Sequence, residues 1–152
     1  MIRSRLFPLL ALVLVLPACN NDDNNAGPCG FNINENTVFY EFQHQGSGDT
    51  FIAWTDDPDV IANVEAQLAL PEAQRNQHIN GEIARWPADC GALWEWTWYF
   101  VGNEWDLADI SIEVCDGDPN YVSANLEEFI DDTNGRYCPW SSYVLREVPS
   151  PF

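Results

Sequence analysis

Hydrophobic and polar residues alternate with a period of two along several short stretches of the chain. The first two stretches are Val38–His44 and Thr50–Thr55, and a Gly-Ser-Gly segment at positions 46–48 lies between them. Alternation on both sides of a glycine-containing turn is typical of a β-hairpin that buries one face of each strand. We therefore expect residues 38–55 to form an antiparallel hairpin.

An Asp-Pro pair at positions 57 and 58 marks the start of a predicted helix. The Asp57 carboxylate can accept hydrogen bonds from the free amide groups of a first turn, where proline is also well tolerated. Beyond this pair, apolar residues recur at helical spacing on one face: Val60, Ile61, Val64 and Leu68. Pro71 then ends the helix, because proline cannot continue it.

A second Asp-Pro pair, at positions 118 and 119, predicts a second helix. Its apolar residues again share one face: Tyr121, Val122, Leu126, Phe129 and Ile130. Gly135 lies just beyond the last of them, and glycine commonly follows the end of a helix. We therefore expect a helix that begins at Pro119 and ends before Gly135.

Three further alternating stretches, residues 78–86, 93–101 and 109–115, lie between the two predicted helices, and Ser142–Val148 follows the second. The resulting order is ββαβββαβ, with short turns between most strands. This order predicts an α+β fold, in which a twisted, mostly antiparallel sheet has two helices packed on one face. Residues 36–152 are enough for one hydrophobic core and too few for two, so we expect a single domain.

The first nineteen residues have the three parts of an export signal. Basic Arg3 and Arg5 precede an apolar run at 6–16 that is too short to span a bilayer. Leu-Pro-Ala-Cys at 16–19 resembles a bacterial lipoprotein box, which implies cleavage before Cys19 and acyl chains on its thiol and new amine. Two or more acyl chains hold a protein stably on a membrane. The alternative is ordinary signal cleavage that leaves Cys19 free.

Residues 1–18 are thus a predicted lipoprotein signal peptide, and residues 19–35 have the composition of a spacer. This segment begins with a run of Asn and Asp residues that lacks apolar periodicity, which predicts a flexible acidic tether. Asn20, in place of an aspartate retention signal, follows the cysteine. By resemblance to such lipoproteins, we expect a cell-envelope protein anchored to the outer membrane, with its domain outside the cytoplasm.

The charge of the mature chain excludes one class of partner. After cleavage the chain keeps four arginines, no lysine and all 24 acidic residues, a formal net charge of −20. Such a surface repels phosphate backbones, so nucleic acid is an unsuitable ligand. It suits cations, basic partners or simple solubility. The expected partners are the membrane, through the lipid anchor, and an unknown extracellular protein or glycan.

Four cysteines remain when Cys19 is set aside, namely Cys29, Cys90, Cys115 and Cys138. An even number in an exported domain predicts two disulfides, and four cysteines allow three pairings. The spacing alone does not choose between these pairings, although we favour Cys115 with Cys138 and Cys29 with Cys90. A zinc site is the rival interpretation, but the chain has no CxxC or close Cys/His spacing to support it.

Several segments together resemble a known family. The segments are Ile-Asn-Gly-Glu-Ile at 79–83, Trp-Tyr-Phe at 98–100, Ile-Glu-Val-Cys-Asp at 112–116 and Cys-Pro-Trp-Ser-Ser at 138–142. On these residues, the chain from about position 38 to 148 resembles the N-terminal domain family named after the calmodulin-binding protein BP-seventy-four. The resemblance also favours pairing Cys115 with Cys138, whereas Cys29 and Cys90 depart from the family pattern. It implies no established activity.

Trp94, Trp96, Trp98 and Phe100 point to one face of the predicted strand at 93–101. An exposed row of this kind could stack on sugar rings. Buried beneath helices, the same row would form the core, and aromatic rows at strand period are usually buried. We therefore interpret the row as core, with Trp94 as the residue best placed to be an exception.

The opposite face of that strand carries Glu95, beside His78 and Glu82 on one expected neighbour and Ser111 and Glu113 on the other. If the face were enclosed, repulsion between like charges would raise the pKa of one carboxyl and make it a usable general acid. A glutamate-based hydrolase acting on an extracellular substrate is therefore one hypothesis. The alternative is the solvated face of a one-sided sheet.

Two loop segments carry closely spaced aspartates, Asp56 and Asp59 in one and Asp116 and Asp118 in the other. Calcium takes six to eight oxygen ligands from flexible loops, so calcium-dependent adhesion is a further hypothesis. The alternative is helix capping, which Asp118 is placed to perform. The chain contains no GxSxG motif and no glycine-rich phosphate loop. Our main hypothesis is thus a membrane-tethered, non-catalytic recognition module with no cofactor.

Overall fold

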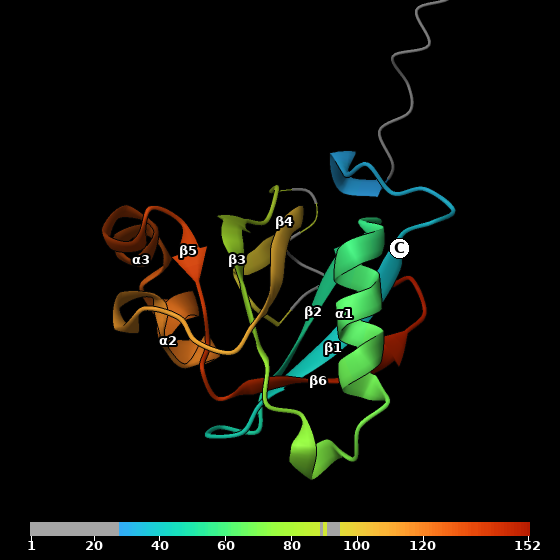
Figure 1. Ribbon diagram of the computed structural model, residues 1–152. Helices are drawn as coiled ribbons and strands as arrows, with labels where there is room; N and C mark the ends of the chain where they lie inside the picture. The colour runs from blue at the N-terminus through green and yellow to red at the C-terminus, as the bar shows by residue number, and fades with distance from the viewer. Residues whose placement is uncertain (1–27, 89, 91–94) are drawn as a thin grey trace, which may run out of the picture.

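The structure, a computed structural model, describes residues 28–88, 90 and 95–152 (Figure 1). Its strands form two antiparallel sheets with the orders β2-β1-β6 and β4-β3-β5. In chain order the elements are η1 (Pro28–Gly30), β1 (Val38–His44), β2 (Thr50–Thr55), α1 (Pro58–Leu68), η2 (Glu72–Gln74), β3 (His78–Arg85), β4 (Trp98–Ala108), η4 (Glu113–Cys115), α2 (Pro119–Ala124), α3 (Leu126–Thr133), β5 (Arg136–Tyr137) and β6 (Ser142–Val148). The predicted α+β class and hairpin are confirmed.

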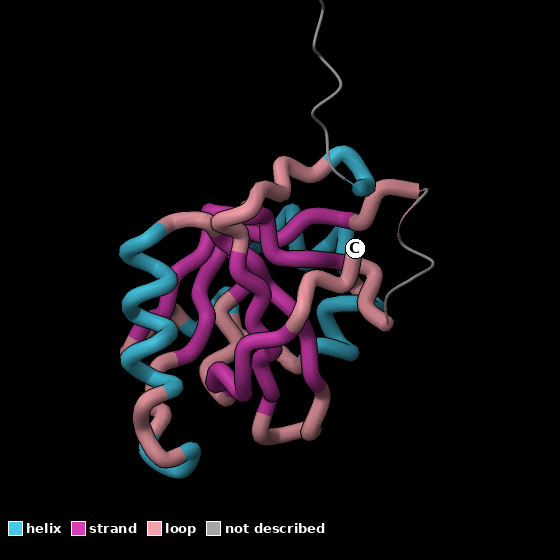
Figure 2. Tube along the Cα trace, turned by 90° about the vertical axis from the view of Figure 1, so that its right-hand side faces the viewer, coloured by secondary structure: helices cyan, strands magenta, loops and turns pink. Residues whose placement is uncertain are grey.

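Both sheets contribute to one main hydrophobic core, as expected for a single domain. Strand β2 packs against β4 across the two sheets, α1 packs against β4 and β6, and α3 packs against β3 and β5. Figure 2 shows α1 along one side of the strands. The largest side chains of the core with almost no exposed surface include Tyr40, Phe42, Trp98, Phe100 and Tyr137. The predicted single sheet is thus divided into two three-stranded sheets that share a core.

Helix α1 begins where the first Asp-Pro pair predicts. Asp57 Oδ1 accepts hydrogen bonds from the amides of Asp59 at 2.9 Å and Val60 at 3.4 Å. Pro58 is its first residue. Val60 and Val64 are buried in the core, which places the expected face of the helix against the sheets.

The second predicted helix is broken into α2 and α3 at Asn125, whose backbone angles (φ −124°, ψ 28°) are not helical. The Asn125 side-chain amide donates to the Tyr121 carbonyl at 2.9 Å. The side chain therefore satisfies a backbone carbonyl at the end of α2. Val122, Leu126 and Phe129 are nevertheless buried as expected. Tyr121 instead points outward and is 56% exposed.

Strand β4 is longer than predicted, and the predicted strand at 109–115 does not form. Phe100 pairs with Ile83, and Trp105 pairs with Gly81. The four residues 101–104 therefore lie opposite a single residue of β3, Glu82. This β-bulge interrupts the alternation of buried and exposed residues. The strand therefore continues to Ala108, and residues 113–115 form η4 instead.

The aromatic row of β4 is part of the core. Trp96 lies just before the strand, and Trp98 and Phe100 lie within it; all three are buried. The interpretation of the row as core is therefore confirmed for these residues. Trp94 lies outside the residues that the structure describes.

The two disulfides pair Cys115 with Cys138 and Cys29 with Cys90, with Cα–Cα distances of 5.2 and 5.8 Å. The favoured pairing is therefore confirmed. Among the described residues, no helix combines the length and the apolar character that a membrane crossing requires.

Replacing both Cys115 and Cys138 with alanine is expected to lower the free energy of unfolding by about 3 kcal/mol. The bond spans a sequence separation of 23 residues, and a loop of this size restricts the unfolded chain by about that amount. Urea unfolding of the double variant beside the parent protein measures the difference. A loss below about 1 kcal/mol would contradict the expectation.

Residues near the start of the described chain pack on the domain, although the predicted tether included them. The Phe31 ring lies 5.1 Å from the Trp54 ring and 4.9 Å from the Tyr99 ring, measured between centroids. Cys29 is tied to Cys90 in the same region. The packed part of the chain therefore begins earlier than residue 36, because an aromatic side chain and a disulfide hold this segment.

Candidate functional site

The three glutamates of the predicted hydrolase face lie on different parts of the chain, and all three are exposed. Glu95 lies three residues before β4 begins, and Glu113 lies in η4, five residues after β4 ends. Glu82 is exposed on β3 opposite Arg136. All three carboxylates are exposed, and a glutamate-based acid and base pair has no support from this geometry.

The histidine and serine of the same predicted face do meet. His78 is buried at the start of β3, and its Nε2 lies 2.6 Å from Ser111 Oγ. Asn80 Nδ2 donates to the same oxygen at 2.7 Å. Burial lowers the pKa of His78, and the nearby carboxylates of Asp116 and Asp109 oppose this shift. At neutral pH the imidazole is therefore mostly uncharged.

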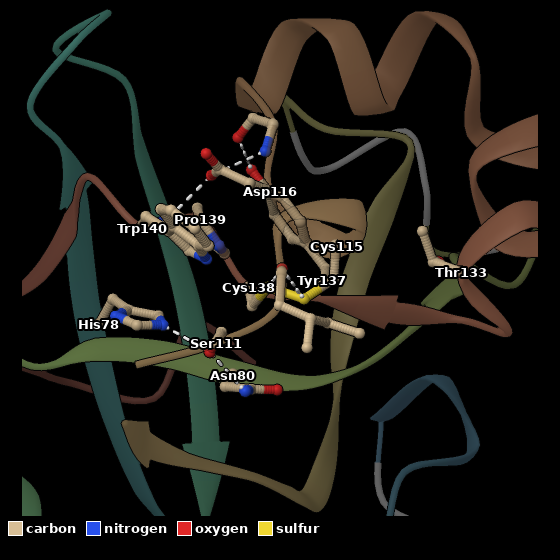
Figure 3. The surroundings of a disulfide bond; sticks show 12 residues. His78, Asn80, Ser111, Cys115, Asp116, Thr133, Tyr137, Cys138, Pro139 and Trp140 are labelled. Carbon is tan, nitrogen blue, oxygen red and sulfur yellow. Dashed lines mark hydrogen bonds between the residues drawn. A yellow bond between two sulfur atoms is a disulfide. The ribbon is translucent and has the colours of Figure 1, made fainter. Parts of the chain in front are cut away.

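The second aspartate pair has structural hydrogen bonds. Asp116 Oδ1 accepts from the backbone amides of Gly117 and Trp140, each at 2.9 Å, and so joins the two sides of the Cys115–Cys138 bridge (Figure 3). Asp118 Oδ1 accepts from the amide of Asn120 at 2.9 Å, at the start of α2. The predicted capping role of Asp118 is thus confirmed.

The first aspartate pair is divided between two environments. Asp59 is exposed in the first turn of α1, whereas Asp56 accepts hydrogen bonds from two asparagine side chains. No group of three His, Cys, Asp or Glu residues arranged to hold a metal ion occurs within residues 28–88, 90 and 95–152. Calcium binding at these aspartates stays a prediction.

Asp56 lies at the rim of a cavity of about 260 Å³, which we call the Trp54 pocket. Three parts of the chain form it: the segment before β1, the end of β2 and the bulge of β4. The lining residues are Gly30, Phe31, Asn32, Thr37, Trp54, Asp56, Tyr99, Val101, Gly102 and Asn103. Aromatic carbons, amide groups and one carboxylate therefore face the same space.

The β4 bulge positions Asn103 at the pocket. Its backbone is in the left-handed region (φ 63°), which asparagine tolerates better than most residues. Asn103 Oδ1 accepts from Thr55 Oγ1 at 2.7 Å and from the Asp56 amide at 2.9 Å. Its Nδ2 donates to Asp56 Oδ1. One hydrogen of Nδ2 is thereby used, and the second is left for a ligand.

A second asparagine holds the other side of the carboxylate. Asn34 Nδ2 donates to Asp56 Oδ2, and the Asn34 backbone amide donates to Thr37 Oγ1 at 3.0 Å. These side-chain hydrogen bonds, first from Asn34 and then from Asn103, lower the pKa of Asp56 below its usual value. Asp56 is thus ionised at neutral pH and fixed in orientation, with further lone pairs on each oxygen.

A fixed aromatic cluster forms one side of the Trp54 pocket. The Trp54 and Tyr99 rings are stacked, with centroids 5.6 Å apart and planes 9° apart. An added Cβ at Gly102 would lie 2.7 Å from Trp54 Nε1, so only glycine leaves the indole edge uncovered. Trp54 is 4% exposed and lines the pocket, and in the described part of the chain its Nε1 donates no hydrogen bond within the protein.

The Trp54 pocket suits a small ligand that carries several hydroxyl groups. Asp56 can accept hydrogen bonds, Trp54 Nε1 and Asn103 can donate them, and the Asn32 side chain can do both. The aromatic rings offer apolar surface to C–H groups of the same ligand. Rigid polar groups beside apolar surface are typical of small-molecule sites.

Sequence reasoning identified Asp56 only as a calcium candidate and missed the rest of the Trp54 pocket. One signal was present, because a glycine inside a strand pattern indicates a bulge or a close approach, and Gly102 lies beside Asn103. Asn34 gave no comparable signal, since its role depends on how the segment before β1 folds back. The pocket therefore depends on long-range contacts.

Comparison with protein-family models shows a match to the N-terminal domain of BP-seventy-four over residues 36–151. The matched range contains all the strands from β1 to β6. It leaves out Gly30, Phe31 and Asn32, which also line the Trp54 pocket. No curated protein and no solved structure matches the chain.

Proposed function

We propose that this chain, which belongs to the family of BP-seventy-four N-terminal domains and matches it over residues 36–151, is a recognition domain whose Trp54 pocket binds a saccharide unit. One observation carries the proposal. The pocket combines an oriented carboxylate, free amide donors and a fixed aromatic cluster in about 260 Å³, a volume that suits one or two sugar rings. Vicinal hydroxyls would bond to Asp56 and Asn103, and ring C–H groups would pack on the aromatic side.

The proposal includes the location of the domain. An export signal followed by Cys19 supports a lipid anchor, and the acyl chains would hold the protein on the outer membrane of the cell envelope. Nine residues separate Cys19 from Cys29, which is fixed to the domain by its disulfide. Ten fully extended steps span at most about 36 Å, so the Trp54 pocket would stay close to the membrane surface.

Asn32 provides the sharpest test of the pocket. It lines the Trp54 pocket and is exposed, and its side chain makes no hydrogen bond in the described part of the protein. Replacing it with alanine is expected to weaken saccharide binding about 5- to 10-fold through loss of one ligand hydrogen bond, with the melting temperature unchanged. Labelled protein on a glycan array identifies the saccharide, and calorimetry measures the affinity.

Asn36 supplies the matched control. It is an exposed asparagine in the same segment, and it does not line the pocket. Its alanine variant is expected to bind like the parent protein. Equal binding by both variants, or an array on which the parent protein binds no saccharide, would contradict the proposal.

A further inference from the structure

A second cavity has a volume of about 280 Å³, and Figure 3 shows three of its lining residues, His78, Ser111 and Trp140, in the surroundings of the Cys115–Cys138 disulfide. Its lining residues are Asn76, His78, Asp109, Ile110, Ser111 and Trp140. None of them lines the Trp54 pocket. We call this cavity the Ser111 pocket, because the Ser111 hydroxyl group faces His78 there.

The hydrogen bonds around Ser111 allow its hydroxyl group to donate to His78. Asn80 Nδ2 can only donate, so the Ser111 oxygen accepts that bond and keeps its own hydrogen for another partner. His78 Nε2, 2.6 Å away, is the acceptor within reach when the imidazole is neutral with its proton on Nδ1. A serine that donates to an imidazole nitrogen has the arrangement of a nucleophile and its general base.

Asn80 has unused hydrogen-bonding capacity beside the same oxygen. Its Nδ2 uses one hydrogen on Ser111, and its buried Oδ1 has no partner among the described residues. Side-chain amides serve as donors to the oxyanion that forms during acyl transfer. The second Nδ2 hydrogen of Asn80 therefore lies close to where such charge would develop.

The mouth of the Ser111 pocket indicates the chemical class of substrate. Ile110 is 86% exposed and Trp140 is 45% exposed, so apolar side chains flank the opening. Asp109 lies at the same opening and would repel a negatively charged acyl group. The Asp116 bond to the Trp140 amide and the Cys115–Cys138 disulfide hold both sides of the opening in place.

We propose that Ser111 is the nucleophile of a second, esterase site that cleaves neutral esters with an apolar acyl group. His78 Nε2 accepts the Ser111 proton as the bond from Oγ to the carbonyl carbon forms. It returns this proton to the leaving alkoxide when the ester C–O bond breaks. Water then attacks the acyl-serine and gives a proton to His78, which returns it to Ser111 Oγ as the bond from Oγ to the acyl carbon breaks and the carboxylic acid leaves. The reaction consumes one water, and no oxidation or reduction takes place.

The test uses p-nitrophenyl butyrate and a fluorophosphonate probe on the purified protein. The probe is expected to label the peptide that contains Ser111. The Ser111→Ala variant is expected to remain unlabelled and to hydrolyse the ester at least about 100-fold more slowly than the parent protein. The rate is also expected to fall in acid as His78 becomes protonated. Burial sets this transition below pH 6.5, against the opposing effects of Asp116 and Asp109.

Ser47 is the matched control, because its hydroxyl lies 3.0 Å from His44 Nδ1 but it lines none of the pockets described above. Ser47→Ala is expected to hydrolyse the ester like the parent protein, and so is Asn32→Ala, which separates this activity from saccharide binding. Absence of the probe from Ser111 in the parent protein would overturn the proposal, even if Ser111→Ala fails to fold. An unchanged rate in a folded Ser111→Ala variant would also overturn it.

Discussion

Replacing Gly81 with alanine is expected to lower the free energy of unfolding by more than about 3 kcal/mol, beyond the usual range for adding one methyl group to a packed interior. An ideal Cβ at Gly81 would lie 2.2 Å from Trp105 Cβ, 2.7 Å from Trp105 Cα and 2.9 Å from the Glu104 carbonyl oxygen. Neither the Trp105 Cβ nor the two backbone atoms can avoid this overlap by a change of rotamer, because the backbone fixes their positions. Strand β4 would have to move away from β3, and the bulge that carries Asn103 would move with it.

Gly117 supplies the control for this prediction. An added Cβ there would meet its nearest atom, Val122 Cγ2, at 3.5 Å, an ordinary contact. Gly117→Ala is therefore expected to change the free energy of unfolding by less than about 1 kcal/mol. Urea unfolding of both variants measures the difference. A Gly81→Ala protein as stable as the parent would show that β3 and β4 do not approach each other as described.

The proposed lipid anchor predicts that replacing Cys19 with alanine removes every acyl chain and leaves the signal peptide attached. In the parent protein, the intact mass after detergent extraction should equal that of residues 19–152 plus three acyl chains and a glycerol. The variant has no thiol to receive diacylglycerol, and its mass should equal that of the unprocessed chain of 152 residues. The loss of membrane affinity follows from the loss of every acyl chain.

Asn20→Ala is the control, because it changes the next residue and keeps the thiol. Its intact mass should show the same lipid as the parent protein. A parent protein that begins at another residue, or that begins at Cys19 with a free thiol, would contradict the lipid anchor. Either result would leave the proposal for the Trp54 pocket untouched, because that pocket is built from the domain alone.

The parts of the fold that the sequence predicts well depend on local patterns. Helix α1 follows from Asp57, Pro58 and the spacing of Val60 and Val64, and all four act as expected. The hairpin of β1 and β2 follows from period-two alternation around a glycine-containing turn. Burial of Trp98 also agrees, because a large aromatic row at strand period has few stable places outside a core.

The errors arise where a single polar residue changes the path of the chain. Asn125 interrupts the second predicted helix, although the apolar spacing continues through it. Asn103 adopts a left-handed conformation within a bulge, so the strand predicted to end at Val101 continues to Ala108. Apolar periodicity describes which residues are buried, and it cannot specify a local conformation that side-chain hydrogen bonds select.

The candidate site was harder to predict than the fold, since each side chain in it depends on distant partners. Asp56 bonds to Asn34 and Asn103, which are 22 and 47 positions away in the sequence. The glutamate hypothesis assumed a strand at 109–115 beside the Glu95 strand, and that strand is absent. His78 and Ser111 were placed on the same face and do meet, although by a loop contact and not by strand pairing.

The most direct test of the Trp54 pocket follows the indole N–H resonances of the seven tryptophans by NMR while glucose, galactose, mannose and N-acetylglucosamine are added in turn. Trp96, Trp98 and Trp105 donate to backbone carbonyls within the protein, at 2.8, 3.4 and 2.9 Å, whereas Trp54 is one of the residues that line the pocket. We predict a saturable shift of the Trp54 resonance with at least one sugar, while these three stay in place. A shift confined to Trp140, or none with any of the four sugars, would contradict saccharide recognition at this site.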